Sequence, residues 1–425
     1  MKPIHTSSPC PICGEPVPAA LVERDGDLFL RRECPRDGAS ESFFWRDAAL
    51  YERAHGLRHP ELLPEGPLDL ERGAADGFLT TFAVDVTTRC NLACPTCVTD
   101  AGAAAAPDPT PAEILSWVPD YSRRAGGFRP NISLVGGEST LRDDLPEIIR
   151  GLIAKGIVPR LNSNGLLLLD EARVDRLWQA GLRWVILQFD GFSPEISRLF
   201  RGRDLIADKQ KVIELLARKG FAIQLAVMVQ RGVNDGEVGE ILRFAAAAPG
   251  VSRVSFYPRS RLGRFADEKR AATDAADVIA ALERTTGGEV TRRDILDAKR
   301  VGRLLFRLTG HPMFRQRVCI YPFLLLRRGS RLLPVSRLFS PAGLLRDPGA
   351  AVKLAWLARK ILRPDQGGFG DDLLFVNIEK FYDREAFDLR EARNCHHVYL
   401  SARGAYPFCV YNAFHRAGGG CESGR

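Results

Sequence analysis

The chain has 425 residues, of which 45% are hydrophobic and 26% are charged, and its net charge is +8. The length exceeds a single hydrophobic core, so we expect two or three domains, and the composition is ordinary for a soluble globular protein. We find neither a secretory signal at the amino terminus nor an apolar run of the roughly 18–20 residues that cross a bilayer, which predicts a cytoplasmic protein. In that reducing compartment the ten cysteines indicate metal binding rather than disulfides. The positive charge favours anionic partners, or it reflects only an arginine-rich composition.

The first 75 residues are predicted to form a small metal-knuckle domain. CPICG at 10–14 and CPRDG at 34–38 flank a strand-like stretch, a pattern typical of paired metal knuckles in which glycine relieves the tight turn. The alternative is a degenerate knuckle that has lost its metal. For a structural zinc or a single iron, the candidate ligands are Cys10, Cys13, Cys34 and Asp37, with His5 as a second choice for the fourth position.

Residues 76–286 alternate strand-like and helix-like segments. Six βα units imply a parallel sheet curled into a partial, TIM-like (β/α)6 barrel, with the chemistry at the carboxyl ends of the strands. The expected strands are 81–88, 132–136, 159–163, 184–190, 222–229 and 254–258, and clear helical patterns cover 144–155, 170–180, 208–219 and 236–247.

The loop after the first of these strands carries the most informative motif, C-x3-C-x2-C, at Cys90, Cys94 and Cys97. Three thiolates on one short loop can hold three irons of a [4Fe–4S] cluster and leave the fourth iron open to a small molecule. A zinc site, which prefers paired CxxC knuckles, and a chance group of free thiols are the alternatives.

Polar residues and glycines end the next strands, where a ligand has to approach. Gly136 and Gly137 let the main chain come close to a bound amino acid, and Glu138 can accept from an ammonium group, although an ordinary turn has similar residues. Arg201 and Arg203 in a charged loop could grip a phosphate or carboxylate, or could simply be solvated. The candidate cofactor-binding residues are Gly136, Gly137, Glu138, Asn162, Ser163, Asn164, Gln188 and Asp190.

Residues 287–425 lose the regular alternation and are predicted to form a separate domain. The apolar stretch 321–339 suggests two strands of a hairpin. Residues 351–363 form a basic amphipathic pattern, which suits an anionic membrane surface or, more simply, a helix on the protein core. Four scattered cysteines remain in this region: Cys319, Cys395, Cys409 and Cys421.

The cysteine motif and its entry strand, Asp85-Val-Thr-Thr-Arg-Cys90, resemble the radical S-adenosylmethionine (radical SAM) superfamily. The N-terminal knuckle, GGE, SNG, QFDG, RGRD, Gly232–Asp235, Leu262–Arg264 and the Cys409 tail resemble one subgroup, the archaeal tetraether lipid synthases and related pterin methyltransferases. The chain departs from that pattern at Asp37, Val98 and Ser139, where the family usually has histidine, an aromatic residue and proline.

The resemblance implies that Cys90, Cys94 and Cys97 hold the catalytic cluster and that Gly136, Gly137 and Glu138 contact the methionine part of SAM. It also implies that the four C-terminal cysteines hold an auxiliary [4Fe–4S] cluster. The expected enzyme cleaves SAM reductively, using a flavodoxin or ferredoxin as reductant. It then removes hydrogen from an unactivated C–H bond, for C–C bond formation or modification of a lipid-like substrate, with peripheral membrane contact as an accompanying expectation. A radical SAM methylase or peptide maturase, and a non-enzymatic iron–sulfur or zinc protein that binds nucleic acid, are the alternatives. Nucleic acid is not an expected partner, because no basic run with interleaved aromatic residues is present.

Overall fold

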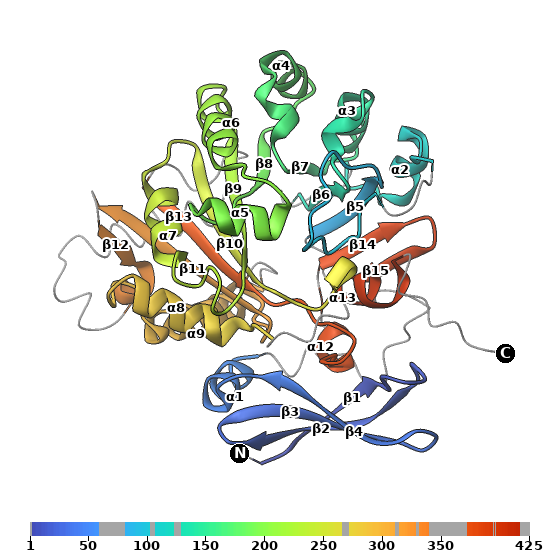
Figure 1. Ribbon diagram of the computed structural model, residues 1–425, viewed down its shortest axis with the longest axis vertical. Coiled ribbons are helices and arrows are strands. Elements are labelled where there is room, and N and C mark those ends of the chain that lie inside the picture. The colour runs from blue at the N-terminus through green and yellow to red at the C-terminus, as the bar shows by residue number, and fades with distance from the viewer. Residues whose placement is uncertain are drawn as a thin grey trace.

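The computed structural model describes residues 2–58, 81–102, 107–122, 129–265, 272–310, 314–328, 331–339, 372–393, 395 and 397–416 (Figure 1). The N-terminal region is a four-stranded antiparallel sheet in the order β1-β2-β3-β4, followed by one helix. Both knuckle glycines, Gly14 and Gly38, have φ near +80°, as the tight turns after the ligands require. These elements are β1 (Ile4–Pro9), β2 (Pro16–Arg24), β3 (Asp27–Cys34), β4 (Gly38–Trp45) and α1 (Ala48–His55).

All six predicted barrel strands are present and parallel, in the order of the sequence. Figure 1 shows α3, α4 and α6 on the outer side of this sheet. The strands are β5 (Thr81–Thr87), β6 (Asn131–Gly136), β7 (Val158–Ser163), β8 (Trp184–Gln188), β9 (Ala222–Val229) and β10 (Val251–Pro258). The helices are α2 (Pro111–Trp117), α3 (Leu145–Ala154), α4 (Glu171–Gln179), α5 (Pro194–Arg201), α6 (Ile206–Arg218), α7 (Val238–Ala247), α8 (Ala275–Thr285) and α9 (Arg292–Thr309), with short 3-10 turns at Ser139–Leu141, Leu166–Leu169 and Gly263–Phe265.

The C-terminal region extends the barrel sheet at both edges. β13 (Leu373–Glu379) pairs parallel with β10, and β14 (His397–Ser401) pairs parallel with β5. The hairpin predicted within 321–339 is confirmed, and its first strand pairs antiparallel with β13. The division at residue 287 stays a prediction, since the sheet is continuous across it. The remaining elements are β11 (Ile320–Arg328), β12 (Arg331–Pro334), a 3-10 turn (Val335–Phe339), α12 (Leu389–Arg393), β15 (Gly404–Pro407), α13 (Phe408–Val410) and one π-helical turn (Tyr411–His415).

Each barrel strand has a face toward the helices and a face toward the barrel lumen. Leu161 and Val254, for example, belong to the main core, whereas Trp184 and Ile186 form a separate cluster with Ala222. The lumen side is where the strand-end residues meet, so the partial barrel predicted from the alternation positions the candidate site. Within the described residues, no helix is long and apolar enough to cross a membrane. The basic amphipathic pattern at 351–363 and its predicted membrane contact lie outside those residues.

Candidate functional site

The three cysteines of the C-x3-C-x2-C motif lie on the loop after β5, and all three line a cavity of about 310 Å³. This cluster loop is held by contacts from two other segments. Thr96 donates a side-chain hydrogen bond of 2.8 Å to the carbonyl oxygen of Phe200 at the end of α5. Arg264 donates to the carbonyl oxygens of Cys94 (2.6 Å) and Cys97 (3.0 Å). The Leu262–Arg264 motif therefore braces the cluster loop, a role that the sequence analysis did not assign.

The donor set fits a [4Fe–4S] cluster with one open iron. Three half-buried thiols face one cavity, which is the ligand number that such a cluster needs. Among the described residues, the N-terminal cysteines and Asp37 are the only group of three or more potential metal ligands with all donor atoms within 4.8 Å of one another. The three motif thiols are therefore spaced more widely than the ligands of a single metal ion. Burial raises the pKa of the Cys90 and Cys94 thiols, and the Arg201 guanidinium beside Cys94 opposes that effect. Iron coordination would complete their deprotonation.

The two glycines after β6 are required by the cluster loop itself. A Cβ at Gly136 would overlap the carbonyl oxygen of Thr87, and one at Gly137 would overlap that of Arg89. The main-chain N–H groups of Gly137 and Glu138 donate to the same two oxygens at 2.8 Å. The glycines thus bring the end of β6 against the cluster loop, while the predicted approach of a bound amino acid to them stays a prediction.

Glu138 joins two strand ends that line the cavity. Its side chain is buried, and Oε1 accepts from Thr140 N (3.2 Å), Thr140 Oγ1 (2.6 Å) and Ser163 Oγ (2.8 Å). Oε2 accepts from Asn164 N at 2.7 Å. The Asn164 side chain in turn donates to Asn91 Oδ1 on the cluster loop at 2.7 Å. An ammonium group at Glu138 would have to share these occupied oxygens, so the primary contact of this carboxylate is within the protein.

Asp190 lies behind the cavity rather than in its lining. Its carboxylate accepts from Arg201 Nε (2.7 Å) and Nη2 (2.9 Å) and from Met228 N (3.1 Å). Gln188 does line the cavity, and it hydrogen-bonds both Asp190 and the buried Lys209 amine. Burial, and then the nearby Arg201 charge, lower the pKa of Lys209 to about 7. Arg201, Lys209 and the Asp190 carboxylate therefore belong to one hydrogen-bonded network behind this side of the cavity, with Gln188 between Asp190 and Lys209.

Arg201 corrects one prediction. The sequence placed it in a flexible loop, but it is the last residue of α5, with a side chain that is 13% exposed. Helix α5 begins after the Ser193 cap with Pro194 and ends at Gly202, whose φ of +82° only glycine adopts easily. These start and stop signals were available in the sequence. The carboxylate that Arg201 grips is an internal one, whereas Arg203 is exposed.

The C-terminal region supplies an aromatic wall that the sequence analysis missed. Tyr257 stacks on Phe381 (5.4 Å between ring centroids), Phe381 contacts Phe408 (4.7 Å), and Phe408 stacks on His397 (4.5 Å). All four rings line the cavity. His397 Nδ1 is 3.7 Å from Glu379 Oε1, and its Nε2 is buried with no hydrogen-bond partner among the described residues. The wall thus combines flat apolar surface with one unused hydrogen-bonding atom.

A second C-terminal contact borders the cavity beside the cluster loop. Tyr399 donates to Asp85 Oδ1 (2.5 Å), and Arg416 donates to Asp85 Oδ2 (2.8 Å). Asp85 lies on β5 just before the cluster loop, while both partners line the cavity. The parallel pairing of β14 with β5 sets Tyr399 opposite Ala83, two residues before Asp85, and this register places the groups together.

Three of the four C-terminal cysteines come together. Cys319 and Cys395 both act on the pKa of Cys409, which burial raises, and Arg317 Nη1 lies 3.6 Å from Cys395 Sγ. The fourth predicted ligand, Cys421, lies outside the described residues. The auxiliary cluster therefore stays a prediction with three of its ligands adjacent.

The N-terminal ligands form a compact group with the dimensions of a single-ion site. Cys13 Sγ and Cys34 Sγ are 3.8 Å apart, and Asp37 Oδ2 is 3.3 Å from Cys10 Sγ and 3.4 Å from Cys34 Sγ. Tetrahedral zinc with Zn–S bonds of about 2.3 Å separates two sulfurs by about 3.8 Å. Among the described residues this group is Cys10, Cys13, Cys34 and Asp37, and it does not include His5.

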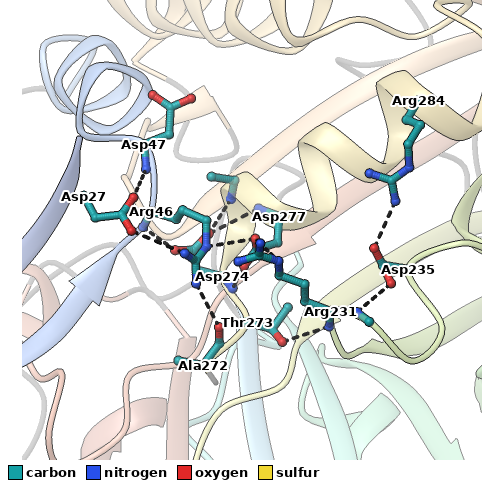
Figure 2. A network of polar contacts seen from close by, with 12 residues as sticks. Asp27, Arg46, Asp47, Arg231, Asp235, Ala272, Thr273, Asp274, Asp277 and Arg284 are labelled. Atoms are coloured by element: carbon teal, nitrogen blue, oxygen red, sulfur yellow. Dashed lines mark hydrogen bonds and ion pairs between the residues drawn. The ribbon is translucent and has the colours of Figure 1, made fainter. Parts of the chain in front are cut away.

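A charged network fixes the N-terminal domain to the barrel (Figure 2). Arg46 pairs with Asp277 (3.0 Å) and Asp27 (3.3 Å), and its main-chain N–H donates to Asp274. Arg231 extends the network to Asp277 at 3.7 Å. Asp274 and Asp277 form the N-terminal capping box of α8, so the N-terminal domain contacts the barrel at the start of this helix.

Comparison with known proteins agrees with this geometry. The radical SAM superfamily matches residues 84–245, and the HMPTM N-terminal zinc ribbon domain matches residues 3–46. The chain therefore contains a radical SAM domain preceded by a zinc ribbon domain.

Two relatives differ in how much of the chain they cover. The 7,8-dihydro-6-hydroxymethylpterin dimethyltransferase of Methanocaldococcus jannaschii is 28% identical over 474 residues, which cover 97% of this chain and 94% of the relative. The probable GTP 3',8-cyclase of Pyrococcus abyssi is 30% identical over 176 residues, covering 41% of this chain and 56% of the relative. This chain thus spans about half the length of that cyclase. The structure of Streptococcus suis SuiB bound to precursor peptide SuiA has a TM-score of 0.41 at 16% identity, over 51% of this chain and 47% of that chain.

Proposed function

We propose that this enzyme binds a [4Fe–4S] cluster through Cys90, Cys94 and Cys97 and modifies an unactivated carbon of a planar, hydrogen-bonding small molecule, by methyl transfer or C–C bond formation. The observation that carries the proposal is one cavity lined both by the three motif thiols and by the aromatic wall. A cluster and SAM held there supply a 5′-deoxyadenosyl radical, which removes hydrogen from C–H bonds that side-chain acids and bases cannot activate.

In this proposal the residues of the chain bind SAM and the substrate and orient them beside the cluster. The GGE and SNG strand ends, tied together by Glu138, form the surface on which SAM rests beside the cluster loop. Arg201, aimed by Asp190, lies next to Cys94 and offers a cation to this end of the cavity. The C-terminal contact of Tyr399 with Asp85 closes the cavity against water.

The substrate class is supported by the aromatic wall and by one relative. Flat rings suit a planar heterocycle, and the free Nε2 of His397 provides one directional contact to it. The relative that spans nearly the whole chain is named for a pterin, which is such a heterocycle. The lipid-like substrate predicted from the sequence stays a prediction. A peptide substrate is less favoured, because the N-terminal domain is an antiparallel metal ribbon rather than a winged peptide-binding domain.

The test is anaerobic reconstitution with iron and sulfide, followed by SAM and dithionite and an assay for 5′-deoxyadenosine. We expect formation of this product in the wild type and in Cys409→Ala, and its loss in Cys94→Ala. No product in protein with a full cluster, together with no SAM-induced change in the EPR spectrum, would refute the proposal. A flavodoxin or ferredoxin should replace dithionite as the reductant.

A further inference from the structure

Two arginines lie inside the barrel lumen and share one tryptophan. The Arg160 guanidinium is 4.0 Å from the ring centroid of Trp184, and that of Arg253 is 4.3 Å from the same ring. Their neighbours along the strands, Leu161 and Val254, face the helices. Since side chains alternate along a strand, both arginines point into the lumen.

No carboxylate among the described residues acts on the charge of Arg160. Its Nε is buried and has no hydrogen-bond acceptor among the described residues. The face of Trp184 attracts the cation, but it does not accept the in-plane N–H groups. The acidic group beside Arg160 is a phenol, that of Tyr257, while burial lowers the pKa of Arg160 to about 10. The pKa of Arg253 is lowered by burial and by Arg160. Arg160 and Arg253 are half-buried and lie side by side, so their like charges repel, and an anion beside them would relieve that repulsion.

This place adjoins the floor of the cavity that holds the motif thiols. In the parallel register Arg160 is opposite Ser133, and Asn162 lies two residues further along the same strand. Both Ser133 and Asn162 line the cavity, and Asn162 Oδ1 is also buried without a partner among the described residues. The next lumen positions, Gln224 and Ser255, are polar and bond to each other at 3.0 Å. The lumen next to the cavity therefore offers hydrogen-bonding groups beside the apolar cluster of Trp184, Ile186 and Ala222.

We propose that this lumen floor binds an anionic group, a phosphate or a carboxylate, of the molecule that enters the cavity, with Arg160 as its direct ligand and Arg253 adding charge. The proposal deepens the proposed function and rests on it, because it gives the planar substrate a negative group at the end away from the cluster. The planar guanidinium of Arg160 suits both oxyanions, which present paired oxygens. A lipid chain would leave the floor unsatisfied.

The probes are inorganic phosphate and acetate, titrated calorimetrically into the reconstituted holoenzyme in a low-salt buffer free of multivalent anions. We expect Arg160→Gln to weaken binding of the preferred probe about ten- to a hundredfold, because a hydrogen bond to a charged group contributes on that order. The matched control is Arg183→Gln, since Arg183 also stacks on a tryptophan, Trp178, at 3.7 Å, but belongs to the outer side of the barrel. The control should bind as the wild type does. Phosphate and acetate titrations then distinguish the two oxyanions.

Stability gives an independent readout. Without multivalent anions, Arg160→Gln should be at least as resistant to unfolding as the wild type, because it removes one of two adjacent like charges. With phosphate present, the wild type should be more resistant to unfolding than Arg160→Gln. Equal probe affinity in the wild type and Arg160→Gln, or no binding to the wild type, would overturn the proposal. Formation of 5′-deoxyadenosine is measured in the same samples, so failure of the lumen site is distinguished from failure of the proposed function.

Discussion

Replacing Glu138 by glutamine is the sharpest test of how the cavity is assembled. Glutamine keeps one carboxyl-like oxygen for Thr140 and Ser163, but its NH2 group would face the Asn164 N–H, which now donates 2.7 Å to Oε2. The variant would lose one buried charge-assisted hydrogen bond, and the glutamine NH2 group and the Asn164 N–H would face each other without an acceptor between them. Each such loss costs about 1–3 kcal/mol, so we expect a total destabilisation of about 2–4 kcal/mol.

The assay is urea unfolding of the metal-free, reduced protein under anaerobic conditions, in which the midpoint should fall without a change in the dependence on denaturant. Glu113→Gln is the matched control. Glu113 also accepts a main-chain hydrogen bond, from Thr110 N at 2.8 Å, but at an exposed helix start, where the loss is about 1 kcal/mol or less. Equal destabilisation of the two variants would refute the reasoning. In reconstituted protein, Glu138→Gln should also weaken SAM binding while iron at the motif cysteines is unchanged, because the two strand ends are no longer tied.

Three further predictions concern other parts of the molecule. Because the pKa of Lys209 is lowered to about 7, the unfolded chain binds more protons than the folded one above that pH, and stability should rise with pH between about 7 and 10. Lys209→Met should flatten that part of the pH profile of the unfolding free energy, and an unchanged slope would contradict the pKa. Asp37→Ala should lower zinc content, measured by mass spectrometry of the purified protein, while leaving SAM-cluster iron intact; full zinc occupancy would remove Asp37 from the ligand set. Cys94→Ala should lose the SAM-cleaving cluster while iron at the C-terminal cysteines survives, as followed by EPR, and equal loss of all iron would show that the sites are not independent.

The barrel was predictable because each of its strands is buried and flanked by a helical repeat. Strands β5–β10 begin and end within three residues of the predicted positions, and the glycines and amides at their ends do line one cavity. The sequence did not show the internal partners of individual polar groups, and their contact with a ligand stays a prediction. Glu138 and Asp190 are engaged by internal donors, and those donors come from other strands and helices. A single sequence shows that such residues lie at strand ends but not what they face.

The C-terminal half of the site could not be predicted, because its contacts join distant parts of the chain. Tyr399 and Asp85 are separated by 314 residues, and the strand that carries Tyr399 pairs with β5 rather than with a neighbour in sequence. The sequence of 287–425 has no regular alternation of strand-like and helix-like segments that would predict this pairing. The aromatic run 406–412 contributed only to the family resemblance.

The division of the site between two parts of the chain explains why the presence of a radical SAM domain does not determine the substrate. Most groups around the cluster loop come from β5–β8 and the turns that follow them, in the part of the chain that the superfamily matches, although Arg264, which braces the loop, lies beyond that part. The wall that a substrate would touch comes from Phe381, His397 and Phe408, which lie beyond that part, and from Tyr257 on the last barrel strand. We therefore expect radical formation and substrate choice to depend on largely different stretches of sequence. Substitutions in the aromatic wall, such as Phe408→Ala, should alter which molecule is modified while leaving SAM cleavage without substrate nearly unchanged.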